Sequence, residues 1–208
     1  QTGPTEVKPA IDACLKRLGR DHLDVMMLHL NDLDVSVARS IFEAMEEARI
    51  AGKIGGYGWS TDFGVRALEM RDLPGFVAVE HAVNVMMDVP SVRNTVEEMG
   101  AVGLIRSPLA MGVLTGKYSD GARVPADDVR AMDNSRRDYF QGGVASIDYV
   151  ARLETVRDLL QTSGRTLAQG ALCWLLAISE RSLPIPGAKT PEQVIENAGA
   201  LAFGALPA

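Results

Sequence analysis

The sequence predicts an α/β protein built on a parallel sheet, and it favours an incomplete (β/α)8 TIM barrel. Segments typical of helices alternate with short apolar runs along the 208 residues, as in a parallel sheet that helices cover. Polar residues close successive strand candidates, and barrel active sites lie at that end of the strands. The alternative, a doubly wound sheet, normally carries GxGxxG after its first strand, and this sequence has no such motif.

The first half of the chain shows this alternation most clearly. Apolar residues recur at helical spacing over residues 4–19, 37–51, 63–71 and 90–99. Continuous apolar runs predict strands buried on both faces at residues 23–30, 54–60, 76–83 and 102–109. Ser36 stands where a helix N-cap belongs. The glycines of residues 54–60 weaken that strand unless another backbone or a ligand comes close to it.

The second half begins with a long polar loop at residues 119–143, and a loop of this length is usually functional or mobile. Further elements are predicted as helices at 146–162, 166–178 and 191–202 and a fifth strand at 183–186. Thr190 and Pro191 suit the N-cap and first position of the last helix. A complete barrel has eight strands in about 250 residues. We therefore expect residues 1–208 to form one domain with about five of the eight β/α units, the others being absent upstream.

Composition and charge exclude several classes of protein. The chain has 21 Lys and Arg against 27 Asp and Glu, a net charge of −6, so its surface would repel nucleic acid. No apolar run reaches the roughly 18 residues that a membrane helix needs. Cys14 and Cys173 lie in apolar helical patterns, which predicts two buried free thiols in a reducing, cytoplasmic compartment.

His29 is the first candidate for chemistry, because it lies near the end of the predicted strand 23–30. It is either a packed core histidine or an imidazole that projects into a cleft and donates a hydrogen bond to a substrate oxygen. His22 is expected at the surface and His81 in the core. The three histidines lack the spacing of metal ligands, so no metal site is predicted.

Three later segments are candidates for ligand binding. Ser60 and Thr61 either cap a turn or bind an amide or phosphate through their hydroxyls. Residues 107–118 form either a simple turn or a loop around a pyrophosphate, with Lys117 as its charge. Residues 186–197 place Gly187, Lys189 and Thr190 before a helix N-terminus, which suits an anion. Gln193, Glu196 and Asn197 place amide and carboxylate groups on one face of that helix. These groups suit a purine, although a capped surface helix would have the same sequence pattern.

Four ordered stretches together resemble the aldo-keto reductase superfamily: CLKRLGRDHLDVMMLH (14–29), AGKIGGYGWST (51–61), SPLAMGVLTGKY (107–118) and IPGAKTPEQVIENAGAL (185–201). The resemblance implies a (β/α)8 barrel that binds NADP(H) without a Rossmann motif. It further implies hydride transfer between nicotinamide and a small-molecule aldehyde, ketone or alcohol. His29 matches the family's catalytic histidine, which stabilises the charge that develops on the carbonyl.

The other three members of the family's catalytic tetrad, Asp, Tyr and Lys, precede that histidine and have no match in this sequence. The resemblance therefore does not assign the proton donor to any of the tyrosines that follow His29, which are Tyr57, Tyr118, Tyr139 and Tyr149.

The resemblance also implies a set of cofactor-binding residues. Ser60 and Thr61 match the pair near the nicotinamide carboxamide, usually Ser-Asn. Glu80 stands where Gln is common, and Arg106 replaces an aromatic residue that often stacks on the ring. The remaining matches fall in two groups: Ser107, Pro108, Leu109, Ala110 and Lys117 at the pyrophosphate, and Gly187, Lys189, Gln193, Glu196 and Asn197 at the adenosine and its 2′-phosphate. Lys189 favours NADP over NAD by charge, and residues 119–143 resemble the family's loop over the cofactor.

Three functions are consistent with these observations. The first is an NADP(H)-dependent oxidoreductase of which this chain is an inactive fragment, as its start at Gln1 suggests. The second is a non-catalytic, cofactor-sensing or regulatory protein on the same fold. The third is a different barrel enzyme that acts on phosphorylated substrates. Because an incomplete barrel leaves strand edges and core residues exposed, we also expect the chain to associate.

Overall fold

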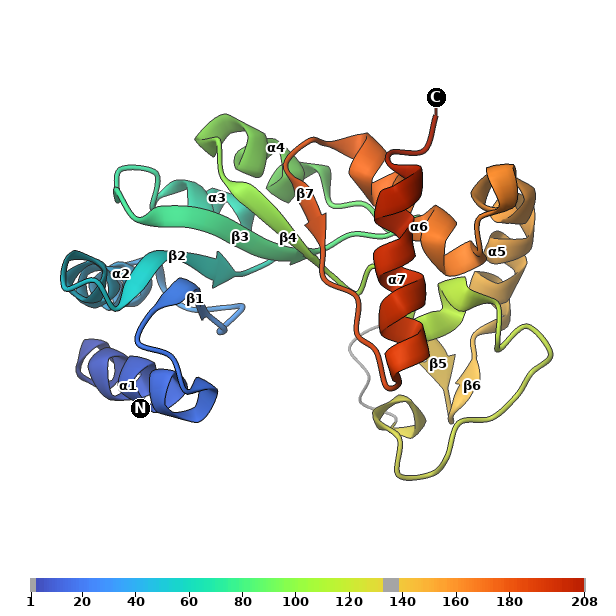
Figure 1. The fold of residues 1–208 in the computed structure, drawn as a ribbon, viewed down its shortest axis with the longest axis horizontal. Coiled ribbons are helices and arrows are strands. Elements are labelled where there is room, and N and C mark those ends of the chain that lie inside the picture. The colour runs from blue at the N-terminus through green and yellow to red at the C-terminus, as the bar shows by residue number, and fades with distance from the viewer. Residues whose placement is uncertain (1–2, 133–138, 208) are drawn as a thin grey trace. The chain divides into compact units, whose positions relative to one another are not determined.

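The computed structural model describes residues 3–132 and 139–207, and it confirms an α/β fold (Figure 1). Five strands form one sheet in the order β1-β2-β3-β4-β7. The chain divides into two compact units, one of residues 1–81 and 89–104 and the other of residues 82–88 and 105–208. The expectation of a single domain stays a prediction.

The first unit alternates helices and strands as the sequence predicts. In chain order, its elements are α1 (Val7–Leu18), β1 (Leu23–Leu28), α2 (Val35–Ile50), β2 (Ile54–Ser60), α3 (Gly64–Leu68), most of β3 (Phe76–Ala82), α4 (Pro90–Met99) and the start of β4 (Val102–Arg106). β1 pairs with β2 and β2 with β3, both parallel. Gly19 and Gly100 end α1 and α4 in the left-handed conformation, which glycine adopts without a steric penalty.

Aromatic side chains fill the space between α2 and the sheet. Phe42 of α2 contacts the rings of Tyr57, Trp59 and Phe76 at centroid distances of 5.2–5.7 Å. The Tyr57 hydroxyl donates to Glu46 at 3.0 Å, and burial together with this bond raises the pKa of Tyr57 to about 12. Tyr57 is therefore a fully buried core residue that keeps its proton near neutral pH.

Gly58 lets β2 and β3 approach closely. A Cβ atom at this position would lie 2.3 Å from the carbonyl oxygen of Ala78 in β3. The neighbouring strand itself thus explains this glycine, with no need for a ligand. Because the opposing atom belongs to the backbone, it cannot move aside without disturbing the strand pairing.

The second unit is built mainly from helices. Its elements are a 3-10 segment η2 (Ala110–Thr115), a 3-10 turn η3 (Val129–Ala131), the antiparallel pair β5 (Phe140–Gln141) and β6 (Val144–Ala145), α5 (Ile147–Leu160), α6 (Leu167–Ile178), β7 (Ser182–Pro184) and α7 (Pro191–Phe203). α6 packs against both α5 and α7. Thr166 begins α6 with a capping box, and Thr190 is the N-cap of α7, as the sequence predicts.

Some sequence expectations were wrong in detail. Asp34, not Ser36, caps α2, and its carboxylate accepts from the backbone N–H groups of Ser36 and Val37. The strand predicted at 102–109 ends at Arg106, because Ser107 has a φ of 54° and leaves the extended conformation. Both cysteines are free, but Cys14 is only half-buried, whereas Cys173 is buried.

Within residues 3–132 and 139–207, no three His, Cys, Asp or Glu residues are grouped as metal ligands would be. In the same ranges, none of the helices has the length and apolarity to cross a bilayer.

Replacing Gly58 by alanine should destabilise the first unit. The added methyl group collides with the Ala78 carbonyl, and overpacking of this kind costs about 1–3 kcal/mol. Urea unfolding of the 208-residue chain measures the change. Gly3→Ala is the control, because a Cβ at Gly3 meets nothing within 4 Å. Equal stability of Gly58→Ala and Gly3→Ala would contradict the close strand approach.

Candidate functional site

His29 and Glu80 face each other in the first unit, beyond the end of β1. His29 directly follows β1, and its Nε2 lies 3.8 Å from Oε1 of Glu80 in β3. The His29 side chain is 78% exposed and that of Glu80 13% exposed. His29 is therefore not a packed core histidine, the alternative that its apolar strand allowed. Its imidazole is open to a ligand and lies near a carboxylate.

Ser60 and Thr61 lie at the end of β2, next to Glu80. Ser60 is opposite Glu80 in the strand register, and the Thr61 N–H donates to the Glu80 carbonyl at 2.9 Å. Both residues are buried. The structure thus brings four predicted residues, His29, Ser60, Thr61 and Glu80, to neighbouring strand ends. The other two histidines also match expectation, because His22 is exposed and His81 is buried.

A cavity of about 750 Å³ lies within the second unit, in the range of about 300–1,000 Å³ typical of small-molecule sites. Nine of the predicted cofactor residues line it: Ser107, Pro108, Leu109, Lys117, Gly187, Lys189, Gln193, Glu196 and Asn197. Arg106, at the end of β4, and Ala110, which is fully buried, do not line it. Two segments far apart in the sequence therefore form one concave surface.

The wall formed by residues 107–112 has an unusual backbone. Ser107, Ala110 and Met111 have φ values of 54°, 48° and 55°, and such a conformation costs a non-glycine residue about 1 kcal/mol or more. The side-chain amide of Asn84 donates to the Ser107 carbonyl at 3.1 Å and helps hold the turn. Strained backbone of this kind gathers at ligand-binding sites.

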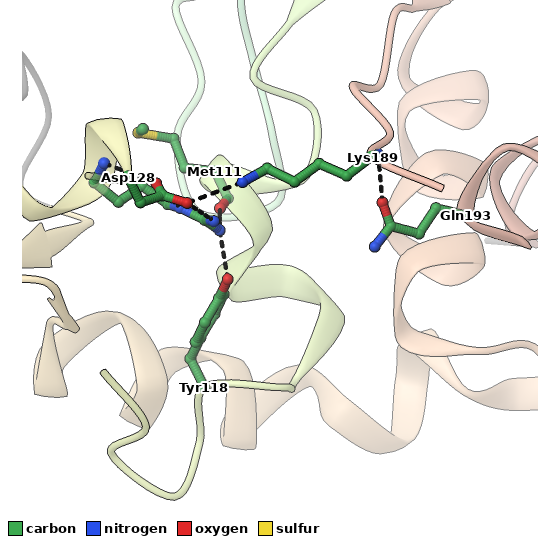
Figure 2. Close-up of polar contacts among 6 residues, drawn as sticks. Met111, Tyr118, Asp128, Lys189 and Gln193 are labelled. Carbon is green, nitrogen blue, oxygen red and sulfur yellow. Dashed lines mark hydrogen bonds and ion pairs between the residues drawn. The ribbon is translucent and has the colours of Figure 1, made fainter. Parts of the chain in front are cut away.

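The opposite wall is the N-terminus of α7 (Figure 2). Thr190 caps the helix by accepting from the Gln193 N–H, and the Gln193 side-chain oxygen accepts from the Lys189 N–H at 2.7 Å. The unpaired N–H groups and the dipole of a helix N-terminus attract anions. Lys189, which is 74% exposed, adds a positive charge at the same place.

Asp128 is a site residue that sequence reasoning missed. Figure 2 shows its carboxylate facing the Lys189 ammonium. The Nζ atom of Lys189 lies 2.9 Å from Oδ2 of Asp128. Arg130 binds the same carboxylate through Nε at 2.7 Å and Nη2 at 2.5 Å. The hydrogen bonds from Arg130, and then the one from Lys189, hold the pKa of Asp128 far below its ordinary value. Asp128 therefore remains a carboxylate throughout the neutral and mildly acidic range.

Arg130 connects this carboxylate to residues 107–118. Its Nη1 donates to the Met111 carbonyl at 3.2 Å and to the Tyr118 hydroxyl. The loop predicted at 119–143 is thus anchored to the cavity through η3, although residues 133–138 lie outside the described part. The sequence signal for the contact between Asp128 and Lys189 is weak. It consists of the segment DVR (128–130) within the polar loop, and no periodicity relates this segment to Lys189.

The charges in the cavity are balanced. Its lining includes three cations, Lys117, Arg130 and Lys189, and three acids, Asp127, Asp128 and Glu196. Arg130 is buried against Asp128, whereas Lys117 and the Lys189 side chain are exposed. A phosphorylated ligand therefore has two accessible ammonium groups to bind. Gln193, Glu196 and Asn197 supply hydrogen-bonding groups for a polar ring system.

Comparisons with known proteins find relatives that align with most of this chain. The yakc aldo-keto reductase of Schizosaccharomyces pombe, whose name specifies NADP(+), is 28% identical over 208 residues. A probable voltage-gated potassium channel subunit beta of Oryza sativa subsp. japonica is 30% identical over 196 residues. The alignments cover 95% and 90% of this chain, which spans 58% of the length of each relative.

A structural comparison bears on the fold, and a family comparison bears on the assignment to a family. The holo form of aldo-keto reductase AKR11C1 from Bacillus halodurans has a TM-score of 0.72 at 21% identity, covering 99% of this chain and 62% of that structure. This likeness confirms the barrel type of fold, and the barrel is not closed by the residues that the structure describes. The profile of the Aldo/keto reductase family matches residues 3–208. The chain belongs to the aldo/keto reductase family.

Proposed function

We propose that this chain is part of an NADP(H)-dependent oxidoreductase that transfers hydride between the cofactor and a small aldehyde or ketone. The observation that carries the proposal is the cavity of the second unit, which exposed Lys117 and Lys189 line together with the first turn of α7. These features suit the phosphates of a dinucleotide. The NADP(+) in the name of the yakc relative is consistent with this choice of cofactor.

The residues of the cavity fit such a cofactor by their chemistry. Lys117 and the strained turn after Ser107 would hold the pyrophosphate, and Lys189 with the first turn of α7 would hold the 2′-phosphate. The adenine would meet hydrogen-bonding groups of the α7 face, which belong to Gln193, Glu196 and Asn197. Arg106 and Ala110 do not line the cavity. They would contact the cofactor through their backbone groups or after a rearrangement.

The residues of the first unit would act on the carbonyl. When bound, the nicotinamide supplies the hydride. The exposed His29 imidazole would donate a hydrogen bond to the carbonyl oxygen, on which negative charge develops. Glu80 would accept from the carboxamide NH2 group, since a carboxylate only accepts, and buried Ser60 would support it. The Asp, Tyr and Lys of the family tetrad have no match in these residues, so the reaction is proposed for the whole protein.

The second candidate is a cofactor-sensing regulator on the same fold. The probable potassium channel subunit beta of Oryza sativa subsp. japonica, at 30% identity, favours it. Reduction of a generic aldehyde with NADPH by the whole gene product distinguishes the candidates. Turnover supports the oxidoreductase, whereas tight NADPH binding without turnover supports the regulator. Preferential binding of sugar phosphates would support a barrel enzyme for phosphorylated substrates.

Lys189→Ala should weaken the binding of NADPH but not that of NADH. Loss of a charge-assisted contact to the 2′-phosphate should weaken NADPH binding about tenfold or more, while NADH, which lacks that phosphate, changes little. Calorimetric titration of the 208-residue chain measures both. Lys8→Ala is the control, because Lys8 is an exposed residue of α1. Equal losses for both cofactors would contradict the role of Lys189.

Asp128→Asn should strengthen NADPH binding several-fold. In the structure the Asp128 carboxylate already engages Lys189, and its negative charge also repels an incoming phosphate. Asp127→Asn is a matched control, since Asp127 lines the same cavity but is exposed. If Asp128→Asn weakens NADPH binding as much as Lys189→Ala, the carboxylate orients the lysine and does not compete with the phosphate.

A further inference from the structure

We propose that Thr61 is a positioning residue for His29 and that its side chain does not bind the cofactor. This inference rests on the proposed function, in which His29 meets the carbonyl oxygen. It departs from the role that the sequence motif suggests for Thr61. All the contacts that carry it lie within the first unit.

The hydroxyl of Thr61 is buried and uses its proton and one acceptor position inside the protein. Its Oγ1 donates to the Asn31 carbonyl at 2.8 Å and accepts from the Phe63 N–H at 3.1 Å. Thr61 has 0% exposure. A hydroxyl has a single proton to donate, so this side chain has no donor left for a carboxamide oxygen.

Two further hydrogen bonds hold the same backbone. The indole Nε1–H of Trp59 donates to the Leu30 carbonyl at 2.9 Å, and the Asp62 N–H donates to the Asn31 side-chain oxygen at 2.8 Å. Leu30 and Asn31 are the two residues that follow His29. Groups at the end of β2 and just beyond it therefore fix the chain on the C-terminal side of His29.

The backbone, more than side-chain packing, determines where His29 lies. On its N-terminal side, Leu28 is the last residue of β1 and pairs with Trp59. On its C-terminal side are the bonds to Leu30 and Asn31. The His29 ring itself is 78% exposed, and Glu80 is 3.8 Å away. A ring held in this way depends on its backbone anchors for the sub-ångström placement that catalysis requires.

Thr61→Val tests this role because valine keeps the shape and removes the hydroxyl. The change leaves the Asn31 carbonyl and the Phe63 N–H without this partner, and the segment after His29 should loosen. In NMR spectra of the 208-residue chain, the imidazole signals of His29, assigned with His29→Gln, should shift or broaden while those of His22 stay unchanged. Thr61→Ser keeps the hydroxyl and should restore the wild-type signals.

Thr155→Val is the matched control, since it removes a hydroxyl bonded to the Arg152 carbonyl within α5 of the second unit. NADPH affinity, measured by calorimetry, should stay within about twofold in Thr61→Val. Unchanged His29 signals together with a tenfold loss of NADPH affinity would overturn the proposal and make Thr61 a cofactor ligand. If wild type itself binds no NADPH, the proposed function fails, while the His29 signals still test the anchor.

Asn31→Ala supplies a second test should Thr61→Val fold poorly. Asn31 is only half-buried, and its loss removes the acceptor for the Asp62 N–H. The same perturbation of His29 is expected. Wild-type His29 signals in Asn31→Ala would contradict the proposal.

Discussion

The ion pair between Lys189 and Asp128 is the interaction on which the candidate cofactor site depends. It joins the segment before α7 to the polar loop, and Arg130 extends the connection to Met111 and Tyr118. Three stretches of chain thereby enclose one cavity. Because Asp128 has both cations as partners, the buried carboxylate stays charged. The same ion pair holds Lys189, which a phosphate would need. In the proposed complex, the phosphate of the ligand would therefore replace the Asp128 carboxylate as the partner of Lys189.

In the first unit, the corresponding constraint is the fixed end of β2. Parallel pairing places Leu28 beside Trp59 and Ser60 beside Glu80. The ends of β1 and β2 are therefore aligned with each other and with Glu80 of β3. Gly58 permits the close approach of β3 that this register needs. His29 then stands exposed near a carboxylate. The arrangement separates two roles, since buried hydroxyl and indole groups provide rigidity and the exposed imidazole remains available for chemistry.

Much of this could be predicted from the sequence, because the signals were local. Helical spacing with terminal glycines gave α1 and α4 to within a few residues, and Thr190 with Pro191 marked the start of α7. Tertiary contacts could not be predicted from the sequence. Asp128 lies in a loop without periodicity, and only folding brings it to Lys189. Thr61 carries a hydroxyl that suits either a ligand or a turn, and the burial on which our proposal rests is known only from the folded structure. Asp34 and Ser36 are both good N-caps, and they stand two residues apart.

The central claim is that the second unit binds the phosphorylated adenosine end of NADP(H). Titrating the 208-residue chain with adenosine 2′,5′-bisphosphate, and separately with AMP, tests it without the nicotinamide or any turnover. The account predicts saturable heat for the bisphosphate, clearly weaker binding of AMP, and an affinity that falls as salt is added. A folded chain that gives no heat with the bisphosphate, or that binds the two nucleotides equally, would contradict it.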